Sequence, residues 1–111
     1  GGTNKAPSPM QLLLASLANC MEISALLYFS FSNVRVNSIK LKIEAEFDQR
    51  YILPLPEAPL PGFSNLKCTW YLSTSASRGK IEKVIKKVEQ NCPVKGTYDR
   101  SPNFSNHIEI V

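Results

Sequence analysis

A long apolar stretch near the start of the chain, SPMQLLLASLANCMEISALLYFSF (residues 8–31), limits the available folds more than any other feature of the sequence. Ser8, Pro9 and Gln11 form the pattern of a helix capping box with proline at the first helical position. Apolar residues then fill most positions, so the predicted helix has no polar face. Such a helix is buried within a protein or crosses a membrane.

The stretch itself leaves three interpretations open. About 20 apolar residues can span a bilayer, but Glu22 would then lie near the membrane centre at a cost of about 2.5–3.5 kcal/mol. The second interpretation is a core helix in which Cys20 is only a small hydrophobic residue. The third is a helix pair that holds Cys20 as a reactive thiol. In that case Asn19, a good capping residue, would break the helix and begin a second one, with Cys20 at its positive end.

The size of the chain indicates how such a helix is covered. With 111 residues, the chain 1–111 is expected to form a single domain. A monomer of this size buries only about two-thirds of the surface that its unfolded chain exposes. Because an all-apolar helix is difficult to surround on those terms, we expect a homo-oligomer.

The charge does not indicate a nucleic-acid partner. The formal net charge is +4, but the basic residues are dispersed. The densest cluster, four lysines between residues 80 and 87, is interleaved with glutamates and is typical of a solvated helix face. No glycine-rich phosphate loop, GXXG clamp or RNP-type aromatic motif is present, and we expect neither nucleic acid nor membrane as a partner.

The three cysteines, Cys20, Cys68 and Cys92, are widely spaced and contain no C-x-x-C pair. With His107 as the only histidine, they predict neither a disulfide scaffold nor a metal site, and no cofactor is expected. Cysteine usage of this kind fits a reducing, cytoplasmic setting. The chain begins Gly-Gly without the basic segment of a signal peptide.

The middle of the chain predicts two strands joined by a loop. Residues 39–47 alternate between apolar and charged side chains, which indicates a half-buried antiparallel strand. Residues 48–62 contain four prolines and read as an extended surface loop. Residues 66–72 predict a second strand with Cys68 on its apolar face, where its expected role is packing.

The last part of the chain predicts an amphipathic helix followed by turns and a short strand. Ser75 or Ser77 would cap the helix, whose apolar residues recur at i, i+3, i+4 and i+7. Pro93 would stop or redirect it. Residues 96–103 read as turns, and residues 107–111 as a strand with its two isoleucines pointing inward. His107 would have no catalytic role there.

Two motifs together resemble a known family. The helix carries S-P-x-x-L-L-x-A-x-L-x-x-C, ending at Cys20, and VEQNCPV places a C-P-V motif at Cys92. This combination, with the intervening order of strand, proline-rich loop, strand and helix, resembles the OsmC/Ohr family over essentially all 111 residues. The resemblance implies an α+β, OsmC-like fold, in which two central helices pack with antiparallel sheet in an intertwined homodimer. The family's usual N-terminal strands would be missing from residues 1–111.

The resemblance also implies an activity and its site. Cys20 would be the peroxidatic cysteine and Cys92 the resolving cysteine, joined by an intrachain disulfide during turnover. The substrates would be organic (alkyl or lipid) hydroperoxides, favoured by the apolar helix, and a cellular dithiol would be the reductant. A sulfenic acid on Cys20 would be the intermediate.

The sequence departs from the family where the thiol is activated. A free thiol is mostly protonated at pH 7, and a helix N-terminus supplies less than the free energy required to ionise it, so a cation must contribute. In the family that this chain resembles, the cation is an arginine in the N-terminal strands, which would be missing here. No arginine of this chain matches its position. Met10 and Gln11 stand where family members carry the glutamate that orients this arginine. The alternative is therefore a non-catalytic OsmC-like dimer that binds an apolar ligand at its interface.

Overall fold

The computed structural model describes residues 2–111 and has an α+β architecture. It divides into two compact units, which we call the helical unit and the hairpin unit. The helical unit comprises the residues up to 35 together with residues 76–111, and the hairpin unit comprises residues 36–75. In chain order the elements are α1 (Pro9–Phe31), β1 (Ser38–Phe47), the 3₁₀ helix η1 (Gln49–Ile52), β2 (Phe63–Ser73), α2 (Arg78–Asn91) and α3 (Pro93–Asp99).

Helix α1 begins at the predicted capping box. The Ser8 hydroxyl accepts a hydrogen bond from the Gln11 backbone N–H at 3.2 Å, and the Gln11 side-chain oxygen accepts one from the Ser8 N–H at 2.8 Å. The helix ends at Phe31, as predicted, and Asn33 follows in the left-handed conformation with φ of 53°.

The predicted break at Asn19 is wrong, because α1 is continuous from Pro9 to Phe31. Asn19 is exposed on this helix, and one unfavourable residue in a helix interior costs at most about 0.7 kcal/mol. Apolar packing on both sides of Asn19 outweighs that cost. Cys20 therefore lies in a helix interior and not at a helix N-terminus.

One side of α1 forms the core of the helical unit. Four residues spaced four apart are buried there: Leu17, Met21, Ala25 and Phe29. α1 packs against both α2 and α3, and α2 contributes the buried Val84 and Val88. Large apolar residues elsewhere on α1 stay exposed: Leu12, Leu13, Ile23, Leu26, Leu27 and Phe31.

By length and composition α1 is also able to cross a membrane. Its most apolar 18-residue window has a mean hydropathy of 1.7, and 22% of that window is buried in the structure. The core helix of a soluble protein can have the same length and composition.

Helix α2 is capped by Ser77, whose hydroxyl accepts a hydrogen bond from the Lys80 N–H at 3.4 Å. It is amphipathic, as its periodicity predicts, and ends at Asn91 before the proline. The prediction of turns from residue 96 onward is wrong for its first part, because Pro93 begins the further helix α3. Proline is favoured at a first helical position, and the chain thus turns from α2 into α3 at Cys92.

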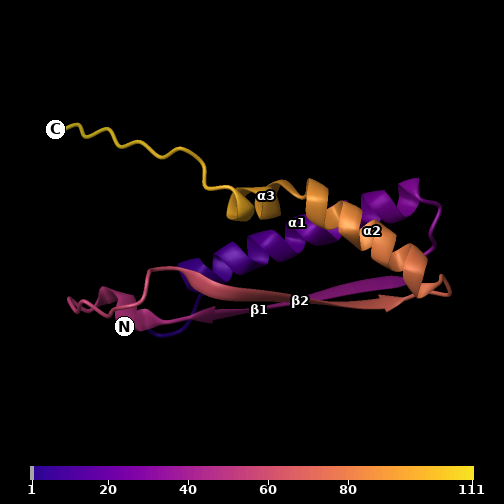
Figure 1. Ribbon diagram of the computed structural model, residues 1–111, viewed down its shortest axis with the longest axis horizontal. Helices are drawn as coiled ribbons and strands as arrows, with labels where there is room; N and C mark the ends of the chain where they lie inside the picture. The colour runs from indigo at the N-terminus through magenta and orange to yellow at the C-terminus, as the bar shows by residue number, and fades with distance from the viewer. Residues whose placement is uncertain (1) are drawn as a thin grey trace. The chain divides into compact units, whose positions relative to one another are not determined.

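The hairpin unit is a two-stranded antiparallel sheet, whose strands run side by side along their length (Figure 1). The apolar residues of the two strands face each other across the ladder: Ile39 with Leu72, Leu41 with Trp70, Ile43 with Cys68, and Ala45 with Leu66. Cys68 is half-buried on this face. The proline-rich connection contains one short helical turn, η1, which the sequence did not predict.

The predicted strand over residues 107–111 is wrong. The chain beyond α3 carries neither helix nor strand, and it is the extended yellow segment in Figure 1. Ile108 and Ile110, expected to point inward, are 82% and 96% exposed. Alternation over five residues is a weak signal, because a strand is stabilised by cross-strand partners. In the part of the chain that the structure describes, β1 and β2 pair only with each other.

Candidate active site

Two thiols that are 72 positions apart in the sequence meet inside the helical unit. The Cys92 sulfur lies 3.3 Å from the Cys20 sulfur and donates a hydrogen bond to it. Both thiols are free. A disulfide has an S–S bond of about 2.05 Å, so joining the two sulfurs requires an approach of roughly 1.2 Å. Residues in this arrangement can alternate between a dithiol and a disulfide.

Each cysteine is positioned by a different part of the fold. Cys20 lies in the interior of α1 and is half-buried. Cys92 is 2% exposed and forms the corner between α2 and α3. It follows Val84 and Val88 at the same spacing of four, so the apolar side of α2 leads directly to this thiol.

Burial raises the pKa of the Cys92 thiol above its ordinary value, because a thiolate is poorly solvated there. The Cys20 sulfur acts in the same direction. The backbone N–H groups of Lys95 and Val94, in the first turn of α3, act in the opposite direction because they favour the thiolate, although the Cys92 side chain makes no capping hydrogen bond in this structure. Cys92 is therefore a mostly protonated thiol, with backbone N–H groups in the next turn that favour its thiolate.

A cation of α3, the Lys95 ammonium, interacts electrostatically with this thiol. The Lys95 ammonium is 2.6 Å from Asp99, which raises the pKa of Lys95 above its ordinary value, and Glu89 and Cys92 add to this effect. Lys95 thus interacts favourably with negative charge on the Cys92 sulfur. Two arginines of the chain are paired with surface carboxylates, Arg50 with Asp48 and Arg78 with Glu82.

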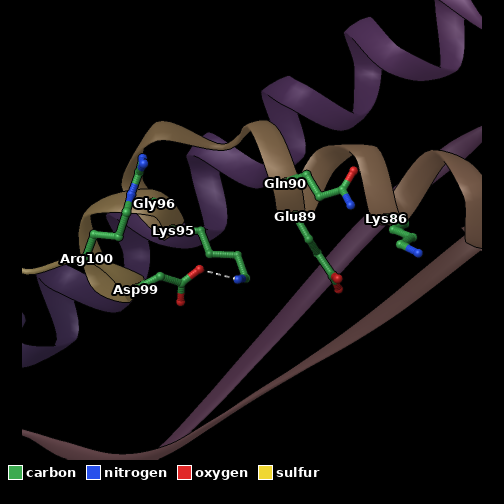
Figure 2. Close-up of a pocket in the computed structure, with 7 residues that line it drawn as sticks. All are labelled: Lys86, Glu89, Gln90, Lys95, Gly96, Asp99 and Arg100. Carbon is green, nitrogen blue, oxygen red and sulfur yellow. Dashed lines mark hydrogen bonds and ion pairs between the residues drawn. The ribbon is translucent and has the colours of Figure 1, made fainter.

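Lys95 borders a surface hollow of about 390 Å³ between α2 and α3 (Figure 2). The hollow is lined by seven mostly charged or polar residues: Lys86, Glu89, Gln90, Lys95, Gly96, Asp99 and Arg100. Figure 2 shows the Lys95–Asp99 ion pair on the α3 side of the hollow, whereas the Arg100 guanidinium points away from that pair. Because these charged groups do not converge on one point, we assign no ligand to this hollow.

Tyr98 links α3 to α1 at the other end of α3. Its hydroxyl donates a hydrogen bond to the Leu13 backbone carbonyl at 2.6 Å. Sequence reasoning missed both Tyr98 and Lys95. The spacing from Cys92 was a usable signal for Lys95, because an N-cap residue interacts with the residue three positions later. Tyr98 gave no such signal, since its partner is 85 positions away.

The remaining candidate residues, Cys68 and His107, are not part of the thiol pair. Cys68 belongs to β2 in the hairpin unit. His107 is exposed in the segment after α3, where it contacts Glu109 at 3.2 Å. Within residues 2–111, the structure places no group of three or more histidine, cysteine, aspartate or glutamate side chains where it could hold a metal ion.

Comparisons with solved structures identify the fold. An OsmC-like protein from Mycoplasma pneumoniae superimposes with a TM-score of 0.76 at 19% identity, over 91% of this chain and 70% of that protein. An OsmC-like hydroperoxide resistance protein from Jannaschia sp. gives a TM-score of 0.78 at 13% identity, over 98% and 71% of the two chains. An organic hydroperoxide resistance protein OsmC from Legionella pneumophila gives a TM-score of 0.62 at 19% identity, over 87% of this chain and 65% of that protein.

At these identities the structural likeness establishes the fold alone. No curated protein sequence matches the chain significantly. The family model described as OsmC-like protein, however, matches residues 2–106, which is nearly the whole sequence. The chain therefore belongs to the OsmC-like family.

Proposed function

We propose that this protein reduces organic hydroperoxides, with Cys20 as the peroxidatic thiol and Cys92 as the resolving thiol. The observation that carries the proposal is the 3.3 Å contact between the two sulfurs, which come from opposite ends of the chain. Membership of the OsmC-like family and the likeness to proteins described as hydroperoxide resistance proteins support a redox role.

The proposed chemistry proceeds in three steps. The Cys20 thiolate attacks the terminal peroxide oxygen, the O–O bond breaks, an alcohol leaves, and Cys20 becomes a sulfenic acid. The Cys92 thiolate then attacks the Cys20 sulfur, which forms the S–S bond and releases the hydroxyl group as water. A dithiol reductant finally reduces the disulfide by thiol exchange and is itself oxidised.

The exposure of the two thiols supports the proposed assignment of their roles. Cys20 is the more accessible thiol, so a peroxide can approach it, whereas Cys92 is almost fully buried. Exposed apolar residues that flank Cys20 along α1, such as Leu13 and Ile23, favour alkyl or lipid hydroperoxides over hydrogen peroxide. We further propose a homodimer in a reducing compartment such as the cytoplasm, in which these apolar residues form part of the interface.

A second candidate function is a non-catalytic dimer that binds an apolar ligand. The exposed apolar residues of α1 favour it, because they offer a surface to a hydrophobic molecule as well as to a second chain. Under this alternative the two cysteines would be packed thiols without turnover.

Peroxide consumption by cysteine variants tests the proposal. The parent protein should consume cumene hydroperoxide continuously with dithiothreitol, Cys20→Ser should consume none, and Cys68→Ser should behave like the parent. Cys92→Ser should form the Cys20 sulfenic acid, trapped with dimedone, but no intrachain disulfide. Peptide mapping should find Cys20 and Cys92 in one disulfide and Cys68 free. Parent protein without turnover, or a disulfide that contains Cys68, would contradict the proposal.

A further inference from the structure

We propose that Tyr98 is a positioning residue for disulfide formation: by bonding α3 to α1, its hydroxyl holds the Cys92 sulfur beside the Cys20 sulfur. The inference rests on the proposed function, because it concerns the step in which Cys92 resolves oxidised Cys20. In this proposal, a residue outside the thiol pair determines how readily the two sulfurs form a disulfide.

The two contacts lie at opposite ends of α3. At one end the Cys92 and Cys20 sulfurs are 3.3 Å apart, and at the other the Tyr98 hydroxyl is 2.6 Å from the Leu13 carbonyl oxygen. Tyr98 comes six residues after Cys92, and Leu13 seven residues before Cys20. At about 1.5 Å per residue these separations are about 9 Å and about 10 Å, so their lengths match. α3 therefore runs antiparallel to the first half of α1 and is attached at both ends.

The tyrosine bond is well suited to this attachment. The Leu13 carbonyl lies inside α1, and its second lone pair is open to a side-chain donor in addition to the backbone donor four residues later. Burial raises the pKa of Tyr98 above its ordinary value, so the hydroxyl stays protonated and able to donate at neutral pH.

The other polar contacts from α3 side chains do not perform this function. The Thr97 hydroxyl bonds to the Pro93 carbonyl at 2.9 Å, and Lys95 bonds to Asp99, so both contacts stay within α3. A helix of seven residues is too short to be stable alone, and its place depends on tertiary contacts. The position of Cys92 at the start of α3 thus depends on what fixes the rest of α3.

The consequence concerns one chemical step. When Cys20 is a sulfenic acid, the Cys92 thiolate forms the S–S bond and the S–O bond breaks, with the hydroxyl group leaving as water. To form the bond, the two sulfurs must move closer by roughly 1.2 Å from their observed separation of 3.3 Å. If α3 stays attached through Tyr98, Cys92 searches only a small volume. If the attachment is lost, α3 moves more freely and the effective concentration of Cys92 at Cys20 falls.

The test compares Tyr98→Phe with Tyr28→Phe, both in a Cys68→Ser background. Tyr28 lies on α1 in the same unit, and its ring contacts Phe31. Titration with reduced and oxidised glutathione gives the effective concentration of the two thiols. Tyr98→Phe should lower it about three- to tenfold, the effect of one ordinary hydrogen bond, and should slow disulfide formation by a similar factor. The rate at which cumene hydroperoxide oxidises Cys20 should be unchanged in Tyr98→Phe. In Tyr28→Phe, the effective concentration and the rate of disulfide formation should both be unchanged.

The outcomes separate this inference from its basis. A purely structural role would lower the urea midpoint of Tyr98→Phe but leave the glutathione equilibrium of the folded protein unchanged, which would overturn the inference alone. An equal loss in Tyr28→Phe would overturn it as well. A parent protein that forms no Cys20–Cys92 disulfide would overturn the proposed function and this inference together.

Discussion

Cys92 experiences two opposing influences, and their balance decides how fast it can act. Burial raises its pKa, whereas the N–H groups at the start of α3 favour its thiolate. Only the thiolate attacks another sulfur. The rate of disulfide formation should therefore keep rising with pH beyond the range in which an ordinary exposed thiol, with a pKa of about 8.5, is already half ionised.

Lys95 should shift this pH dependence. Its ammonium favours negative charge on Cys92, so Lys95→Gln should move the pH profile of disulfide formation upward and slow the step about two- to threefold at pH 7, the effect of one exposed charge pair. The rate is measured by mixing peroxide-oxidised protein with dimedone and quenching at intervals. Lys86→Gln is the matched control, because it removes a charge from the same surface hollow without a known effect on Cys92. Equal slowing in both variants would indicate a general charge effect and contradict the role of Lys95.

At the scale of single residues, the sequence identified the two thiols but not Lys95 and Tyr98, the residues that interact with them or position them. Cys20 and Cys92 stand out because each lies in a motif, and motifs are local in sequence. Lys95 lacks a motif, and its relevance depends on the position of Cys92 directly before α3, a helix that the sequence did not predict. Tyr98 depends on the path of the chain between residues 13 and 98, which no local pattern encodes.

The elements themselves were predictable wherever a local signal agreed with packing. The Ser8 cap, the 3.6-residue period of α2 and the alternation of β1 each specify an element, and each element occurs. Local reasoning failed where packing overrides a single residue, as at Asn19 inside α1. It also failed for α3, where Gly96 and Thr97 are poor helix formers and tertiary contacts decide the conformation.

Alanine substitutions of two asparagines, Asn19 and Asn33, test whether α1 is continuous. In an unbroken helix Asn19 is an exposed interior residue, so Asn19→Ala should stabilise the protein by about 0.5 kcal/mol. If Asn19 capped a second helix, the same change would destabilise by about 1 kcal/mol. Asn33→Ala is the matched control with opposite sign: Asn33 is left-handed, which alanine adopts at a cost of about 1 kcal/mol. Urea denaturation measures both, and a loss of stability in Asn19→Ala would contradict the continuous helix.

At the scale of the whole molecule, the main feature is the apolar surface that a single chain leaves exposed. All buried hydrophobic residues among those the structure describes belong to the helical unit, yet six large apolar side chains of α1 are between 42% and 77% exposed there. Several large apolar side chains left exposed on one helix are typical of an interface. A second copy of the chain is the occupant that the limited burial of a 111-residue monomer and the family resemblance both favour.

Leu26 provides a direct test of this dimer. It is 62% exposed in the single chain, so Leu26→Lys should leave a monomer folded but remove about 1.5–3 kcal/mol from an interface that buries it. Sedimentation equilibrium at micromolar concentration should find the parent dimeric and Leu26→Lys at least about tenfold weaker in association. Leu60→Lys is the matched control, because Leu60 is 88% exposed in the proline-rich loop and should not change the association. A parent protein that sediments as a folded monomer would contradict the dimer, because the exposed side of α1 would then face solvent or a different partner.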